Sequence, residues 1–105
     1  SGSVKRPGIG LLYIEISAED AAEQKVPQGK QIQSFMPDSP AEAAGLEEGD
    51  VIVRCNGIAL SEHDVLVDTI RAATPGDTIE LSVWREGKTL DFTVVVGDMN
   101  HMVVY

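Results

Sequence analysis

The alternation of apolar and polar positions divides the chain into short elements, most of which are predicted strands. A period of two, which sends successive side chains to opposite faces, is typical of a strand. Strands of this kind are expected at residues 32–36, 51–55, 79–83 and 90–96. Glu86-Gly87 predicts a hairpin between the last two, and Asn56-Gly57 predicts a tight turn with positive φ.

The stretch at residues 6–17, RPGIGLLYIEIS, is a predicted strand that is apolar on both faces. Its alternation places Leu11 and Tyr13 on one face, and Leu12, Ile14 and Ile16 on the other. A strand at the surface of a small protein normally shows one polar face to water. This strand therefore has surplus apolar surface that something else is expected to cover.

Three short helices are predicted from their start signals, each a serine followed three residues later by an acid. These pairs are Ser17 with Asp20, Ser39 with Glu42, and Ser61 with Asp64. The second helix has proline at its first position and Gly45 after its end, which limits it to residues 40–44. The first is expected to reach about Lys25 and the third about Ala73. The predicted fold class is α+β: a partial β-barrel of five to six mostly antiparallel strands capped by two helices.

The third helix has more apolar surface than one core-facing band requires. His63, Val67 and Ile70 form one stripe, and Leu66, Ile70 and Ala73 form the next. Surplus apolar surface on this helix and on the first strand predicts a groove between them. Burial of both faces in the core is the alternative. For His63 alone, exposure to solvent in the first turn is the ordinary expectation.

A glycine step, Gly8-Ile9-Gly10, comes directly before the first strand. Glycines reach backbone conformations that other residues avoid, so their amides can form a small anion-accepting nest. A nest at the head of a strand, beside an apolar slot, suits the C-terminal carboxylate of a peptide. Such a peptide adds as an extra strand to the sheet edge, and we expect it to cover the second face.

Composition limits the classes of partner. The chain has 105 residues, enough for one domain, and is 43% hydrophobic. Its net charge of −9 makes nucleic acid and anionic membranes poor partners, and the acidity is interpreted as a solubility feature. No apolar run approaches the roughly 20 residues that span a bilayer. The single cysteine, Cys55, lies in an apolar strand and is expected to be a small buried core residue.

Catalytic signatures are absent from the sequence. Only His63 and His101 could serve as a histidine base, and there is no Gly-x-Ser-x-Gly, His-Glu-x-x-His or Cys-x-x-Cys motif. The acids are scattered over predicted caps and loops. We therefore expect a binding module with no catalytic residues, no metal and no cofactor.

The sequence resembles a PDZ domain of the type carried by HtrA (Deg) serine proteases, from Arg6 to about Gly97. The matching motifs lie at residues 6–11, 26–29, 39–46, 49–52, 56–57, 75–77 and 85–88. The most specific is Ser-Pro-Ala…Ala-Gly-Leu…Gly-Asp-x-Ile…Asn-Gly, following a strand and preceding a helix. The sequence begins with the binding loop and ends with the hairpin. This order matches the permuted strand order of protease-associated PDZ domains.

This resemblance implies a peptide-binding site for hydrophobic C-termini. The residues it assigns are Gly8, Ile9 and Gly10 in the carboxylate loop, Leu11, Leu12 and Tyr13 on the strand, and His63, Val67 and Ile70 on the helix. It further implies a parent that is a trypsin-like serine protease, in an extracytoplasmic or organellar compartment. The alternatives are an assembly or allosteric module that gates the protease, and a PDZ domain of another membrane or tail-specific protease.

The expected organisation is an expression remnant at residues 1–3, a PDZ domain at 4–97 and a tail at 98–105. The tail ends in β-prone, apolar Val103, Val104 and Tyr105. We expect these residues to add as a strand to the groove of a neighbouring molecule, with Tyr105 in its slot. The expected slot consists of Ile9, Leu11, Val67 and Ile70. An ordinary extension of the last strand is the alternative.

Overall fold

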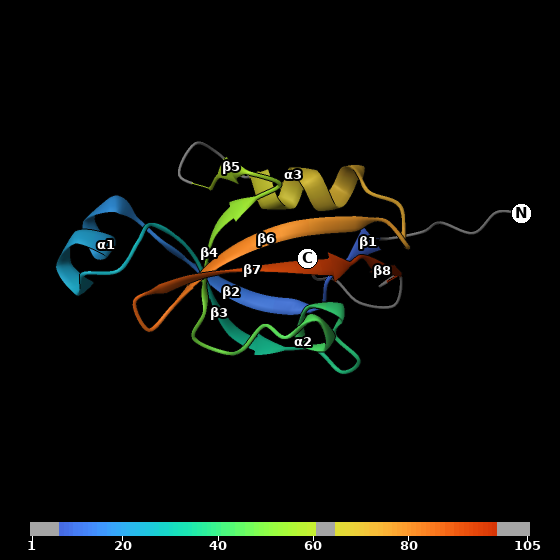
Figure 1. Cartoon of the computed structure of the whole chain (residues 1–105), viewed down its shortest axis with the longest axis horizontal. Coiled ribbons are helices and arrows are strands. Elements are labelled where there is room, and N and C mark those ends of the chain that lie inside the picture. The colour runs from blue at the N-terminus through green and yellow to red at the C-terminus, as the bar shows by residue number, and fades with distance from the viewer. Residues whose placement is uncertain (1–6, 61–64, 99–105) are drawn as a thin grey trace, which may run out of the picture.

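The computed structural model describes residues 7–60 and 65–98, which form a curved antiparallel sheet with three helices (Figure 1). The elements are β1 (Pro7–Gly8), β2 (Leu11–Ile16), α1 (Ala18–Gln24), β3 (Gly29–Phe35), α2 (Pro40–Ala44), β4 (Val51–Cys55), β5 (Ile58–Ala59), α3 (Val65–Ala72), β6 (Thr78–Arg85), β7 (Lys88–Val95) and β8 (Gly97–Asp98). The main sheet runs β2-β3-β4-β6-β7, with β5 paired to β4. It does not close into a barrel, so the predicted α+β class with an open, partial barrel is confirmed.

Alternating side chains from the β6–β7 hairpin build one side of the core. Ile79, Leu81 and Val83 of β6 are almost completely buried, and so is Val94 of β7. Helix α2 packs against β7, while α3 packs against β1 and β4. Burying an aliphatic side chain of this size contributes about 1.5–3 kcal/mol, so this shared apolar surface is what holds sheet and helices together. Helix α1 has no buried residue and projects at one end of the molecule (Figure 1).

The predicted caps and turns are confirmed within the described residues. Ser17 Oγ accepts a hydrogen bond from the Asp20 amide at 3.1 Å, and α1 ends at Gln24 with Lys25 as its C-cap. Asn56 and Gly57 adopt φ values of 51° and 82°, as their predicted turn requires. The predicted start of the third helix, including His63, lies outside the described residues. Its end at Ala72 is one residue short of the prediction.

Strands β1 and β8 form a separate two-stranded sheet that the sequence pattern did not predict. They pair antiparallel, with Pro7 opposite Asp98 and Gly8 opposite Gly97. Two residues are too few to show a period, which is why the pattern misses them. The pairing ties the start of the glycine loop to the segment that follows the hairpin.

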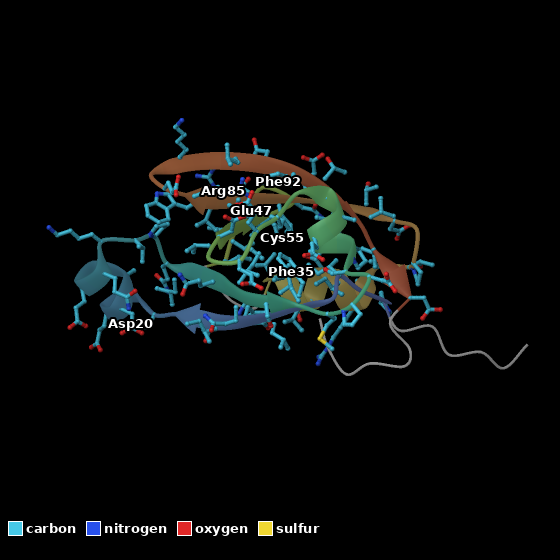
Figure 2. The ribbon with its side chains drawn as sticks, turned by 90° about the horizontal axis from the view of Figure 1, so that it is seen from below. Asp20, Phe35, Glu47, Cys55, Arg85 and Phe92 are labelled. Atoms are coloured by element: carbon cyan, nitrogen blue, oxygen red, sulfur yellow. The ribbon has the colours of Figure 1, made fainter. Side chains whose placement is uncertain are left out.

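A partly buried ion pair between Arg85 and Asp50 joins the hairpin to the segment before β4. Arg85 lies close to Glu47 and Phe92 (Figure 2). Asp50, only 2% exposed, accepts two hydrogen bonds from Arg85, at 2.8 Å to Oδ1 and 2.7 Å to Oδ2. The Glu47 amide donates a third to Oδ2 at 3.0 Å, and the guanidinium lies 5.5 Å from the centroid of the Phe92 ring. The hydrogen bond to Asp50 raises the pKa of Arg85 above its usual value, as does the charge of Glu47. The contacts fix the turn after α2 against β6 and β7.

Candidate peptide-binding site

The glycine loop is held in place through its carbonyl groups. The Ile9 carbonyl accepts hydrogen bonds from Ser39 Oγ at 2.8 Å and from the Ala41 amide at 3.1 Å. The Gly10 carbonyl accepts one from the Met36 amide at 2.8 Å. Gly10 has a φ of 71°, a conformation that costs other residues energy. These contacts from α2 and from the end of β3 determine the path of the loop.

The amides of Ile9 and Gly10 lie in the same loop, in residues that are buried. Within residues 7–60 and 65–98, neither the Ile9 amide nor the Gly10 amide donates a hydrogen bond. Backbone amides without acceptors are costly when they are shielded from water, and adjacent amides of this kind can bind an anion. The carboxylate nest expected from the sequence stays a prediction for these two amides.

Strand β2 follows this loop directly and lies at one edge of the main sheet. It pairs antiparallel with β3, and no other strand of the described chain pairs with it. An edge strand presents a row of backbone N–H and C=O groups to which an extended peptide can add. The position of β2 thus agrees with the predicted strand addition.

The predicted division of β2 into two faces is confirmed at Leu11 to Ile14 and is wrong at Ile16. Leu11 is 1% exposed and half-buried Tyr13 packs against the core, whereas Leu12 and Ile14 are 46% and 49% exposed. The surplus apolar face is therefore the outer face, turned away from the core, and it does not face α3 as expected. Ile16 was expected to share that face but is buried, because the alternation breaks at the end of the strand.

Three of the four side chains of the expected slot meet in the core. Ile9, Leu11 and Ile70 belong to one cluster of buried apolar residues, and each is at most 1% exposed. Val67 is 8% exposed, the highest value among the four. Ile70 therefore agrees with the core alternative, whereas Val67 lies outside that cluster. His63, which is also an expected site residue, lies outside the described residues.

Lys30 is a neighbour of the site that the sequence did not single out. Its ammonium lies 4.8 Å from the centroid of the Tyr13 ring and 3.0 Å from Glu15 Oε1. Lys30 is only 3% exposed, so its cation–π contact with Tyr13 is largely desolvated. The contacts restrain the aromatic side chain that the resemblance places in the groove. The sequence analysis missed these contacts because they depend on the cross-strand pairing of Glu15 with Lys30, which the sequence does not show.

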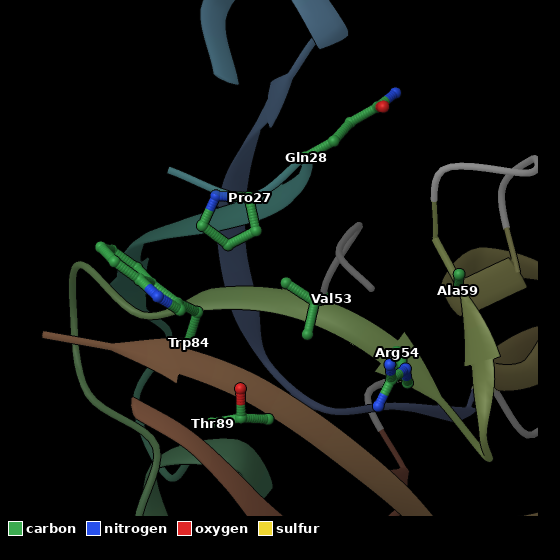
Figure 3. A pocket seen from close by; sticks show the side chains of 7 residues that line it. All are labelled: Pro27, Gln28, Val53, Arg54, Ala59, Trp84 and Thr89. Carbon is green, nitrogen blue, oxygen red and sulfur yellow. The ribbon is translucent and has the colours of Figure 1, made fainter. Parts of the chain in front are cut away.

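A separate hollow of about 350 Å³ lies on strands β4, β6 and β7, away from the glycine loop (Figure 3). Pro27 and Trp84 lie at one end of it, and Arg54 and Ala59 at the other. Arg54 is the one titratable side chain among its described lining residues. This lining offers no acid–base or nucleophilic pair.

Neither a metal site nor a membrane span is found in the described part of the chain. No group of three or more His, Cys, Asp or Glu side chains there could hold a metal ion. None of the helices in residues 7–60 and 65–98 has the length and apolar character needed to cross a bilayer.

A glycine loop leading into an edge strand places the chain among small α+β domains whose sheet edge is open to strand addition. The chain belongs to the PDZ domain family, whose model matches residues 9–96. It is 36% identical over 99 residues to a probable periplasmic serine endoprotease, DegP-like, from Halomonas elongata. That match covers 92% of this chain and 21% of the protease. The chain spans about a fifth of the length of the curated relatives that it matches.

Solved structures of HtrA-type domains share the fold. The HtrA3 PDZ domain bound to a phage-derived ligand (FGRWV) matches with a TM-score of 0.77 and 27% identity, over 98% of this chain and all of that one. The HtrA-type protease AlgW with a decapeptide also gives a TM-score of 0.77, at 26% identity, over 92% of this chain and 30% of that one. The predicted resemblance to HtrA PDZ domains is confirmed.

Proposed function

We propose that this chain is a peptide-recognition module that binds hydrophobic C-termini by strand addition to β2. The observation that carries the proposal is an edge strand directly after a loop whose carbonyls are hydrogen-bonded, and whose Ile9 and Gly10 amides have no acceptor among the described residues. The carboxylate of the ligand binds these two amides, and the ligand backbone pairs with Leu12 and its neighbours in β2. Structures of related domains with a decapeptide and with FGRWV support peptide binding.

The last side chain of the ligand occupies the slot of Ile9, Leu11, Val67 and Ile70. Because these side chains are nearly buried in the free chain, small side-chain movements accompany binding. Tyr13 contacts the ligand further upstream, and Gly8 leads the chain into the loop. His63 is placed by the resemblance alone, at the start of the helix beside the groove.

Calorimetric titration with peptides ending in Val, Leu, Phe or Tyr tests the carboxylate. The contact is one short strand, smaller than a standard interface, so we expect dissociation constants of about 1–100 μM. The matched control is the same peptide with an amidated C-terminus, which we expect to bind at least about tenfold more weakly, because a charged hydrogen bond is lost. Equal binding of both forms, or binding of internal segments only, would contradict the proposal.

For the whole protein we propose a serine protease in the periplasm or another extracytoplasmic or organellar compartment. The names of the relatives support this assignment. The domain would bind exposed C-termini of misfolded or substrate proteins and help to position or activate the protease. Activity assays of the full-length protein with and without a binding peptide test this role.

Self-association through Val103, Val104 and Tyr105 is a second part of the proposal, based on sequence alone because these residues lie outside the described residues. A synthetic peptide of residues 101–105 with a free carboxylate should bind the groove, while its amidated form should not. Deleting the last four residues should leave stability unchanged and raise the affinity for added peptide. No binding of the free-carboxylate peptide would exclude this contact.

A further inference from the structure

The hollow beside Trp84 has an aromatic end and a cationic end (Figure 3). Half-buried Trp84 and Pro27 lie at one end, and exposed Arg54 lies at the other. Its volume of about 350 Å³ is within the range of ligand pockets, and none of its described lining residues is acidic. Tryptophan and arginine are over-represented among the residues that carry binding energy at interfaces. The hollow therefore has the composition of a recognition site.

The Trp84 side chain lies on the face of β6 that points away from the core. Leu81 and Val83 are buried, so the alternation of the strand sends Trp84 to the outer face. Trp84 belongs neither to the cluster of buried apolar residues nor to the described side chains packed against it. Its cross-strand neighbour Thr89 is exposed and also lines the hollow. The indole ring is therefore not engaged in the core, and its open part can contact a ligand.

Three cations without an acidic partner lie at or next to this hollow. In the part of the chain that the structure describes, the side chains of Lys25, Arg54 and Lys88 take part in no ion pair and no hydrogen bond. Arg54 lines the hollow, Lys25 lies two residues before Pro27, and Lys88 directly precedes Thr89. In a chain with a net charge of −9, such a local group of cations complements a negatively charged ligand.

We propose that this hollow binds an acidic protein segment with an aromatic residue, as a second recognition site independent of the glycine loop. The aromatic side chain packs against Trp84 and Pro27, and the neighbouring acidic side chains pair with the guanidinium of Arg54. A nucleic acid fits less well, because its continuous row of phosphates extends beyond the cations and is repelled by the net charge. A short segment places its few charges at the cations alone.

An NMR titration with a peptide blocked at both ends tests the site. The probe is acetyl-Glu-Phe-Asp-Glu-amide, and its matched neutral control is acetyl-Gln-Phe-Asn-Gln-amide. The indole N–H of Trp84 is a specific reporter, because the chain has one tryptophan. We expect it to shift with the acidic peptide, with a dissociation constant of about 0.1–1 mM. The neutral peptide should bind about three- to tenfold more weakly, and the amides of Ile9 and Gly10 should not respond to either peptide.

Variants separate the charge from the ring. In Arg54→Gln the preference for the acidic peptide should fall below about twofold, and the chain should stay folded because the altered side chain is exposed. Arg71→Gln is the matched control: it removes the same charge from an exposed position of α3 outside the hollow and should retain the preference. Trp84→Leu, followed at the backbone amides of β4, should weaken both peptides by a similar factor of about two to ten.

The outcomes that overturn the inference are distinct. Equal binding of both peptides, or a preference that survives in Arg54→Gln, excludes the charge pairing. Displacement of the acidic peptide by one with a free C-terminal carboxylate places it in the groove. A stronger response of the indole to a short DNA strand assigns the cations to phosphate. An indole signal that depends on protein concentration, and not on peptide, assigns the hollow to a second copy.

This site and the proposed C-terminal recognition fail independently. Both probes lack a free carboxylate, so their failure to bind leaves the binding at the glycine loop unaffected. Failure of the free-carboxylate peptides to bind would in turn leave the site beside Trp84 in place.

Discussion

At Gly29, strands β3 and β4 approach so closely that a side chain has no room. A Cβ atom built there would overlap the carbonyl oxygen of Ile52 and lie 3.2 Å from Val51 Cγ1. Both contacts are made by buried residues of β4, which cannot move without disturbing the core. The requirement for glycine at this position is therefore steric.

Gly29→Ala is expected to lower the free energy of unfolding by about 1–3 kcal/mol, the usual range for overpacking. Urea denaturation monitored by the fluorescence of Trp84 measures it. Ser34→Ala, in the same strand, introduces the same residue at a half-buried position and should change stability by less than about 0.5 kcal/mol. Similar losses in both variants would show that the close approach is unimportant.

Cys55 confirms the prediction of a buried core cysteine, since none of its side chain is exposed. Burial raises the pKa of its thiol above 9.0, and a hydrogen bond with Thr69 partly opposes the rise. The folded state therefore keeps the proton at a pH where the unfolded state loses it. The resulting stabilisation is complete below pH 9.0 and is lost as the pH rises through the folded pKa.

Comparison of the unaltered chain with Cys55→Ala isolates this effect, because all other titrating groups are shared. The difference in unfolding free energy between the two chains should be constant up to about pH 8. Above pH 9 the unaltered chain should lose stability relative to Cys55→Ala. Denaturant unfolding between pH 7 and 10.5 measures it. A difference that stays constant over the whole range would contradict burial of the thiol.

At the scale of elements, the residue that caps α2 also contacts the binding loop. Ser39 Oγ accepts a hydrogen bond from the Glu42 amide at 3.1 Å, and the same hydroxyl donates to the Ile9 carbonyl at 2.8 Å. Ser39 is 3% exposed, so this is a buried contact. The serine that begins the helix therefore also holds the loop.

Ser39→Ala is expected to lower the free energy of unfolding by about 1–2 kcal/mol and to weaken peptide binding as well. The reason is that the Ile9 carbonyl loses one of its two donors and the loop gains freedom. Ser17→Ala removes an equivalent but exposed cap from α1 and should cost about 0.5–1 kcal/mol without changing peptide affinity. Thermal unfolding and calorimetry on both variants give the two readings. Equal effects on binding would show that Ser39 acts only as a cap.

The sequence predicted elements whose signals are local. The Ser39 cap, the Asn56-Gly57 turn and the β6–β7 hairpin depend on neighbouring residues, so spacing and residue type reveal them. The outer position of Leu12 and Ile14 depends on which face of β2 meets the core, and both faces of the strand are apolar. The β1–β8 pair and the Lys30 contacts join distant segments. Such long-range pairing has no local signature.

At the scale of the whole molecule, charge should influence which peptides bind. The net charge is −9, and Glu19, Asp20 and Glu23 lie on exposed α1, directly after β2. Asp20 points away from the core (Figure 2). A ligand antiparallel to β2 would run toward this helix with its upstream residues.

Peptides with two lysines upstream should therefore bind several-fold more tightly at low salt than the same peptides with two glutamates. The difference should shrink at high ionic strength, because the Debye length falls from about 10 Å at 0.1 M to about 3 Å at 1 M salt. Calorimetry over a salt series measures this. Salt-independent affinities for both peptides would show that the acidic surface has no part in recognition.

The amides of Ile9 and Gly10 are the most direct reporters of the central claim that this loop binds a C-terminal carboxylate. Two-dimensional ¹H–¹⁵N NMR during titration should show the largest shifts at these amides and along β2 for a peptide with a free carboxylate. The amidated peptide should lose the shifts at Ile9 and Gly10. Identical shifts with both peptides, or shifts confined to the hollow beside Trp84, would contradict the account.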